Sequence, residues 1–364
     1  MNRSRSVAAA VLVAAAWLVA GLALARLLFE WRFPAWLALG RAGPAALCGA
    51  AGAAGGLLLA RRFGRALAWA SAPLLLNLLW LVDPAVDLPR GRFLFAAGWW
   101  LVAVVWAWLR LGPGHRHWLR LGPAFVAAAL LPVYLLTMSS AVGAADTFEF
   151  QVVAPQLGIA HPTGYPLYLL LGKFFSLLPV STVAWRLNFA SAVYATLAAI
   201  VVFRLAHDLL GRPLPALAGA VALGLTPVVW SQAIVAEVYT LHALLVAVAL
   251  GLMLRLVTER RARSTDRRKT VVALAFTIGL GLTNHLTSVF LLPPAALAIA
   301  LRLWRDRGER QRDPDGVIER WLDANTFKAS EEWVGDVRLV VYAVSPLAGA
   351  AAPIAPTPGG AVFA

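Results

Sequence analysis

The chain is 364 residues long, a length typical of two soluble domains, but its composition excludes that architecture. Hydrophobic residues make up 60% of it and charged residues 14%, against roughly 25% charged in soluble domains. Mean hydropathy is +0.74. The net charge of +14 comes from basic residues that lie between apolar segments, where they report membrane topology rather than nucleic-acid binding. The composition predicts an all-α polytopic membrane protein whose partner is the lipid bilayer, with no nucleic acid.

Ten segments are long and apolar enough to cross a bilayer, which takes about 20 mainly apolar residues. The first is interpreted as a retained anchor, because its apolar run is longer than that of a cleaved signal peptide. The predicted spans are residues 7–29, 33–60, 66–82, 93–109, 121–145, 187–203, 214–230, 238–254 and a close pair within 270–304.

The distribution of Lys and Arg predicts an N-terminus on the cytoplasmic side. In that orientation the inside segments carry 22 basic residues, and the outside connections carry five: Arg32, Arg90, Arg92, Lys173 and Arg186. Counting the half-apolar residues 166–180 as a span would move the basic cluster at 255–269 to the outside. We therefore expect residues 166–180 to form an interfacial or re-entrant helix on the outer face.

Three regions follow from this topology. Residues 1–120 form an N-terminal four-span extension, and residues 121–304 form the transmembrane core, whose outer loop spans residues 144–186. Residues 305–364 are predicted to be a cytoplasmic, partly disordered tail, with room for a short helix before residue 340.

Ionisable side chains near the membrane are costly, so those that remain mark candidate functional sites. Three outer connections, far apart in the sequence, carry such groups. They contribute, in order, Asp146, Glu149, His161 and Tyr165; then Glu237 and Tyr239; then Asn284 and His285. Because sidedness was assigned from Lys and Arg alone, this clustering is an independent observation, and it predicts one polar site on the outer face.

Asp146 and Glu149 are three residues apart and share a face if the segment is helical. Two adjacent carboxylates raise each other's pKa, which suits a general base. The alternative is a capping box with Asp146 as the N-cap. The other groups have structural alternatives too: Glu237 could pair with Arg186, and Asn284 with His285 could satisfy a tight turn.

The segment His161-Pro162-Thr163-Gly164-Tyr165-Pro166 is predicted to be a rigid turn that presents an imidazole and a phenol, since proline fixes φ and glycine permits positive φ. Common nucleotide-binding and hydrolase signatures (GxxxxGK[ST], GxGxxG, HExxH and GxSxG) are absent from the sequence. Nucleotide-driven transport and the common hydrolase chemistries therefore lack support.

Five blocks between Asp146 and about Pro294 resemble the protein O-mannosyltransferase-like membrane family, which is itself similar to the GT-C class of glycosyltransferases. The blocks are DTFEF, HPTGYPLYLLLGKFFSLLP, WRLNFASAVYATL, AEVYTLHALL and GLTNHLTSVFLLPP. The resemblance implies a GT-C-like core that transfers a sugar from a polyprenyl-phosphate carrier to a hydroxyl acceptor on a protein or glycan, outside the cytoplasm and at the plasma membrane. It also implies that an acid in the first outer loop, Asp146 or Glu149, acts as the base.

An inverting displacement agrees with both lines of reasoning, because the base and the phosphate leaving group lie on opposite faces of the sugar. In this hypothesis Asp146 is the base and Glu149 tunes it or binds the sugar. The expected substrate-binding residues are His161, Tyr165, Lys173, Arg186, Glu237, Tyr239, Asn284 and His285, of which Lys173 or Arg186 would hold the phosphate.

No cofactor is required by this scheme, although a divalent metal on Asp146, Glu149 and Glu237 stays an open alternative. Two other classes stay open as well: a transporter or flippase of lipid-linked glycans, and an inactive, truncated relative. Charged residues in mid-span, of which Arg26 and Arg41 are the clear cases, would favour transport.

Overall fold

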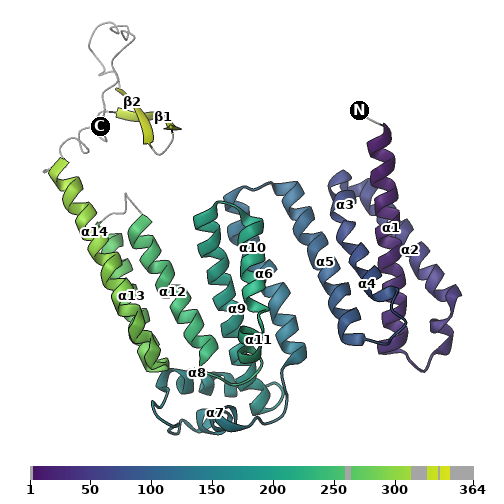
Figure 1. The fold of residues 1–364 in the computed structure, drawn as a ribbon, viewed down its shortest axis with the longest axis horizontal. Helices are drawn as coiled ribbons and strands as arrows, with labels where there is room; N and C mark the ends of the chain where they lie inside the picture. The colour runs from purple at the N-terminus through teal and green to yellow at the C-terminus, as the bar shows by residue number, and fades with distance from the viewer. Residues whose placement is uncertain (1–2, 259–263, 313–325, 335–336, 345–364) are drawn as a thin grey trace, which may run out of the picture.

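The computed structural model describes residues 3–258, 264–312, 326–334 and 337–344. Long helices stand side by side, and helices that follow one another in the chain run in opposite directions (Figure 1). Two short helices lie across one end of them (Figure 1). The N-terminus lies at the opposite end of the array (Figure 1).

The N-terminal extension packs around its first helix. Its elements are α1 (Arg3–Leu27), the π-turn η1 (Leu28–Arg32), the 3-10 turn η2 (Leu37–Gly40), α2 (Ala42–Phe63), α3 (Arg65–Ala70), the 3-10 turn η3 (Ala72–Asn77), α4 (Leu78–Leu81) and α5 (Leu88–Leu111). Glycines allow α1 and α2 to approach closely: a Cβ at Gly21 would lie 2.3 Å from the Cys48 carbonyl oxygen, and one at Gly52 would lie 2.4 Å from that of Trp17.

The core is built around α9, which packs against α6, α10 and α12. Buried Leu130, Tyr134, Phe203 and Leu217 fill the space between α6, α9 and α10. The core elements are α6 (His115–Thr137), α7 (Ala145–Gln156), α8 (Pro166–Ser176), α9 (Val183–Leu210), α10 (Pro213–Gly224), α11 (Pro227–Ala233), α12 (Tyr239–Thr258), α13 (Ser264–Asn284), the 3-10 turn η4 (Leu286–Leu291) and α14 (Leu292–Arg312).

The structure confirms a polytopic helical membrane architecture. Among the described residues, seven helices are long and apolar enough to cross a bilayer, or eight if the bent pair α10–α11 is one span. Each of the ten predicted spans corresponds to a helix or a broken helix, but the segments at 66–82 and 270–284 do not meet both criteria. The total of ten therefore stays a prediction.

Two predicted spans are broken at prolines. The segment at 66–82 changes from α-helix to a 3-10 turn at Pro73, where Ser71 donates its hydroxyl to the Leu67 carbonyl. The segment at 214–230 bends by 64° before Pro227. The residue before a proline is biased toward extended backbone, and Thr226 has ψ 142°.

Two predicted boundaries were wrong. The second span begins at Ala42 rather than at residue 33, because Phe33 accepts a turn hydrogen bond from Trp36 and the short turn η2 follows. The fifth ends at Thr137 rather than at residue 145, because Met138 is extended. Asp146 therefore lies on a separate helix and not at the end of a span.

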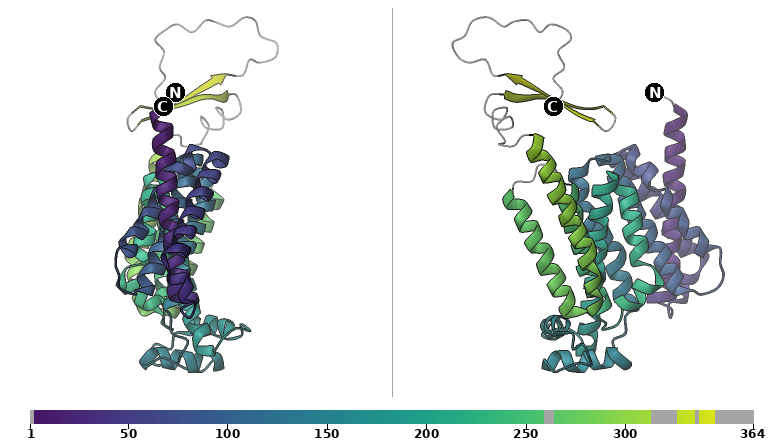
Figure 2. Two further views of the ribbon diagram at one scale, coloured as in Figure 1. Left: turned by 90° about the vertical axis from the view of Figure 1, so that its right-hand side faces the viewer. Right: turned by 60° about the vertical axis from the view of Figure 1, so that its left-hand side comes forward.

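Helices α7 and α8 form a thin layer across the end of the bundle where α6 ends and α9 begins (Figure 1). The two further views show the same layer (Figure 2). Helix α8 forms where the interfacial or re-entrant helix was expected, although it ends at Ser176 instead of residue 180. Its position relative to the membrane stays a prediction. Buried Phe150, Tyr168 and Leu187 fix the layer to α9.

The predicted tail contains structure that the sequence did not indicate. Helix α14 continues to Arg312, and strands β1 (Thr326–Val334) and β2 (Val337–Val344) pair antiparallel with Val334 opposite Val337. The β-branched residues of 337–344 explain the preference for a strand. The predicted disorder of residues 347–364 lies outside the described residues.

Candidate functional site

Helix α7 begins at Ala145 with both acids in its first turns. Its N-cap is Ala144, which offers no side-chain cap. The capping-box alternative for Asp146 and Glu149 is therefore wrong, because the Glu149 carboxylate bonds to His161 instead of the start of its own helix.

The predicted rigid turn is present. The Gly164 amide donates to the His161 carbonyl at 2.7 Å, and Gly164 has φ +84°, a conformation that glycine adopts without a steric cost. Pro166 then occupies the first turn of α8, where its missing N–H costs no hydrogen bond. The turn directs His161 toward α7.

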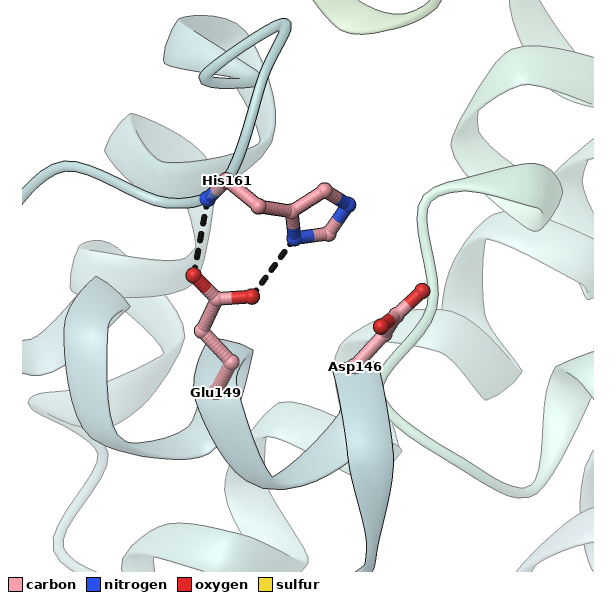
Figure 3. A group of neighbouring side chains, drawn as sticks. All are labelled: Asp146, Glu149 and His161. Carbon is pink, nitrogen blue, oxygen red and sulfur yellow. Dashed lines mark hydrogen bonds and ion pairs between the residues drawn. The ribbon is translucent and has the colours of Figure 1, made fainter.

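His161 lies between the two carboxylates (Figure 3). Glu149 accepts the His161 backbone N–H at 2.7 Å through Oε1, and its Oε2 lies 2.5 Å from His161 Nδ1. Asp146 is exposed and accepts no hydrogen bond from any described residue. One polar atom from each of the three side chains lies within 4.8 Å of the others.

The Glu149–His161 pair is electrostatically favourable. The hydrogen bonds from His161 lower the pKa of Glu149, and the same side-chain bond raises the pKa of His161. Both shifts favour an imidazolium beside a carboxylate. Asp146 and Glu237 also raise the pKa of His161 through their charge.

Glu237, which precedes α12, joins this group from the second connection. It accepts a 3.1 Å hydrogen bond from the Thr147 hydroxyl, and Thr147 is the neighbour of Asp146. Its backbone N–H donates to the Ser191 hydroxyl at 3.3 Å. Burial raises the pKa of Glu237, and the charge of Asp146 adds to the shift. The alternative pairing of Glu237 with Arg186 is not observed.

Aromatic rings connect the turn to the third connection. The Tyr165 hydroxyl lies 3.2 Å from His161 Nε2, and the Tyr165 ring centroid lies 6.4 Å from that of His285. The Tyr239 and His285 rings are 5.5 Å apart. Burial raises the pKa of Tyr165. All three connections thus meet at one end of the bundle.

Two residues of the third connection also have the structural roles considered above. Asn284 is buried and donates to the Val238 carbonyl, which fixes the residue after Glu237. His285 caps η4 by accepting the Thr287 N–H through Nδ1. His242 bonds to the same turn through Thr287 and Ser288.

The structure does not bring the two basic residues into the cluster. Lys173 donates to the Pro155 carbonyl, near the end of α7, at 2.5 Å. Arg186 donates to the carbonyls of Ser176, Val180 and Ser181, and so holds the turn between α8 and α9. Sequence reasoning assigned both to phosphate binding and did not consider these backbone acceptors.

Sequence reasoning missed the polar residues behind the site. Gln151 donates to Asn188 at 2.9 Å and accepts the Gly143 N–H, and Asn188 donates to the Ser139 carbonyl. These bonds hold the linker before α7 against α9. The spacing of Thr147 and Gln151, four residues apart, was the available signal that α7 presents a buried polar face.

A metal ion would find three ligand side chains here, but both ring nitrogens of His161 already have partners. Its Nδ1 contacts Glu149 and its Nε2 contacts Tyr165. An ion bound by Asp146, Glu149 and His161 would require the imidazole to lose one of these partners and its proton.

Fold and site together define a class: a polytopic helical membrane protein with a layer of carboxylates, imidazoles and phenols across one end. Residues 146–308 match the family model of the protein O-mannosyl-transferase TMEM260 N-terminal domain. The predicted resemblance to the O-mannosyltransferase-like family is thereby confirmed, and the matched region contains every candidate site residue.

Two curated relatives carry the same description. The protein O-mannosyl-transferase TMEM260 of Mus musculus is 30% identical over 197 residues, which are 54% of this chain and 28% of the mouse protein. Its Dictyostelium discoideum counterpart is 30% identical over 186 residues, 48% of this chain and 23% of that protein. The match thus spans about a quarter of these relatives' length. No solved structure matches the chain.

Proposed function

We propose that this protein is an inverting glycosyltransferase that moves a mannose-like sugar from a polyprenyl-phosphate carrier to a hydroxyl of a protein or glycan acceptor. One observation carries the proposal: within the region similar to O-mannosyl-transferases, Asp146 is an exposed carboxylate to which no described residue donates a hydrogen bond, next to a Glu149–His161 pair. The GT-C-like character of the core is part of the same proposal.

Asp146 acts as the general base in this scheme. The acceptor hydroxyl oxygen forms a bond to the anomeric carbon, its proton passes to the Asp146 carboxylate, and the bond from the anomeric carbon to the phosphate oxygen breaks. Polyprenyl phosphate leaves without a general acid, because a phosphate is already a good leaving group. Positioned proton transfer of this kind contributes about 10²–10⁴ in rate.

The imidazolium of His161 supplies positive charge beside the two acids. Glu149 accepts the His161 backbone N–H through Oε1, contacts the ring at Nδ1 through Oε2, and raises the pKa of His161. His161 therefore replaces Lys173 and Arg186 as the proposed direct ligand of the donor phosphate. The two basic side chains shape the wall of the site through their backbone bonds.

Glu237 and the aromatic group complete the proposed sugar site. The half-buried Glu237 carboxylate can accept a sugar hydroxyl, and the rings of Tyr165, Tyr239 and His285 provide surfaces for the sugar. Asn284 supports this wall through its bond to the Val238 carbonyl.

We place the site on the outer face of the plasma membrane, because the positive-inside rule orients α7 and α8 outward. Cysteine labelling tests this in a Cys48→Ser background. An impermeant reagent should label Gln156→Cys in intact cells and Ser264→Cys only after the membrane is opened. Labelling of both from the same side would contradict the orientation.

Sugar transfer itself is tested with membranes that contain the full chain, a radiolabelled polyprenyl-phosphate mannose and a membrane-protein extract. We expect label on the acceptor with the unmodified chain and a strong loss with Asp146→Asn. Movement of the labelled lipid between leaflets without transfer would show a transporter. Donor binding with neither activity would show an inactive relative.

The mid-span arginines do not support transport. Arg26 is fixed by Glu30 and three backbone carbonyls, and Arg41 is exposed at the N-cap of α2. Neither residue lines the candidate site.

A further inference from the structure

A half-open cavity of about 520 Å³ lies between α5, α6, α10 and α11, away from the candidate site. Its walls are largely apolar, with Phe93, Ala97, Ala129, Val133 and Leu225 among the lining residues. Arg92, Thr137 and Trp230 provide polar atoms. Since α5 and α6 are both candidate membrane spans, the cavity lies at the depth of the bilayer.

The cavity lies where α5 of the N-terminal extension meets α6, α10 and α11 of the core. Beside it, the Trp100 indole N–H donates to the Phe125 carbonyl at 2.9 Å, and the two rings pack edge to face at 6.4 Å. An apolar opening at this depth is filled by hydrocarbon rather than by water.

The length of the cavity matches one leaflet. Its lining on α5 runs from Pro89 to Leu101, twelve residues apart. At 1.5 Å per residue this is about 18 Å, close to half of the roughly 30 Å hydrocarbon core. A single acyl chain of a lipid in that leaflet therefore has the right length.

Arg92 provides a positive charge near one end of the cavity. Arg92 lies in the second turn of α5, and Thr137 is the last residue of the antiparallel α6. The Arg92 guanidinium lies 4.5 Å from the centroid of the Trp31 ring, and no carboxylate of the described residues pairs with it. Arg90, by contrast, is paired with Asp83. An unpaired guanidinium near the headgroup level complements a lipid phosphate.

We propose that this cavity binds one acyl chain of an anionic glycerophospholipid, whose phosphate pairs with Arg92, and that this lipid completes the packing between the N-terminal extension and the core. This lipid site is independent of the proposed glycosyl transfer. The binding test below has the same meaning whether or not the protein transfers a sugar.

Native mass spectrometry of the full chain, incubated with phosphatidylglycerol, phosphatidylcholine or polyprenyl phosphate, tests the proposal. We expect one retained phosphatidylglycerol. Ala97→Phe should lower the bound fraction about tenfold, whereas the matched Ala103→Phe, exposed on the same helix, should retain it. Arg92→Gln should remove the preference over phosphatidylcholine, and Arg32→Gln, exposed at the end of the neighbouring turn η1, should keep it.

If Ala97→Phe does not fold, thermal unfolding of the unmodified chain and of Arg92→Gln tests lipid binding instead. Phosphatidylglycerol should raise the unfolding midpoint of the unmodified chain more than phosphatidylcholine does, and Arg92→Gln should remove that difference. Equal binding by Ala97→Phe and Ala103→Phe, no retained phospholipid, or displacement of phosphatidylglycerol by polyprenyl phosphate would each overturn the proposal.

Discussion

The C-terminal end of α1 and the whole of α7 lie toward the same end of the helices (Figure 1), and each carries a polar cluster. In the extension, Arg26 donates to Glu30 at 2.7 Å and to the carbonyls of Trp80, Asp83 and Ala85 at 2.7–2.8 Å. Every nitrogen of its guanidinium has a partner. This cluster ties the end of α1 to the turn before α5.

The α7 cluster is only partly closed. Glu149 and His161 satisfy each other, but Asp146 stands exposed beside them without a hydrogen-bond partner among the described residues. The two clusters therefore illustrate two roles that charged side chains have at a membrane surface. A closed cluster stabilises the chain, whereas an open one leaves a carboxylate free to take a proton.

The largest expected effect follows from removing the open carboxylate. Asp146→Asn keeps the shape but removes the basicity, so kcat should fall about 10²–10⁴-fold while donor binding persists. Glu149→Gln should change kcat less and raise the donor KM, because it loosens His161. Both values come from initial rates of radiolabelled transfer.

Asp266→Asn, an exposed acid on α13, serves as the control and should retain full activity. If Asn at position 146 turned over normally and Gln at position 149 did not, the two roles would be exchanged. If neither change mattered, the open cluster would have no catalytic part.

Breaking the Arg26 cluster should lower the unfolding free energy of the protein. Arg26→Met leaves Glu30, whose side chain is only 10% exposed, without its partner. Removing one member of a buried pair costs on the order of 3 kcal/mol in unfolding free energy. Arg90→Gln, which breaks the exposed pair with Asp83, should cost at most about 1 kcal/mol.

Unfolding midpoints in detergent measure both arginine variants, and transfer per folded molecule should stay unchanged in each. Equal midpoints for Arg26→Met and Arg90→Gln would show that the extension cluster is no tighter than a surface pair.

The α7 cluster should also depend on pH, because Glu149 and His161 form an ion pair only while one is ionised and the other is protonated. The pKa of His161 is raised above 6.5, so the pair is intact below that pH and is lost as the pH rises through the raised value. The pKa of Glu149 is lowered below 4.5, so its contribution holds above that pH and is lost as the pH falls through the lowered value. The pair is complete between these two pH values.

Donor KM should therefore rise on the alkaline side, above pH 6.5, as the imidazolium loses its proton. Glu149→Gln removes the stabilising carboxylate and should move this alkaline limb toward lower pH. Asp266→Asn, the control used above, changes no group next to His161 and should leave the limb in place. A limb that is the same in all three proteins would exclude His161 as the titrating group.

The same comparison shows what the sequence could predict. Apolar runs and the distribution of Lys and Arg are properties of single segments, and they predicted the helices and the meeting of Asp146, Glu237 and His285. The turn at 161–166 was predicted because Pro162 fixes its own φ and Gly164 can adopt positive φ.

The misses depend on tertiary partners. Lys173 and Arg186 bond to backbone carbonyls, and any residue offers such an acceptor, so side-chain type gave no signal. The buried pair of Gln151 with Asn188 likewise depends on what packs beside it.

The smallest expected effect is that of metal removal, although Asp146, Glu149 and His161 resemble a metal site in spacing. A metal ligand must offer a lone pair, and an imidazolium offers none. The raised pKa of His161 favours the protonated form, and both of its ring nitrogens already have partners. We therefore expect chelation with EDTA to change the initial rate of sugar transfer by less than about twofold, the scatter expected when no ligand is lost. Loss of transfer in EDTA, with recovery on adding Mn²⁺ or Mg²⁺, would instead make the three residues metal ligands and would remove Asp146 from the role of base.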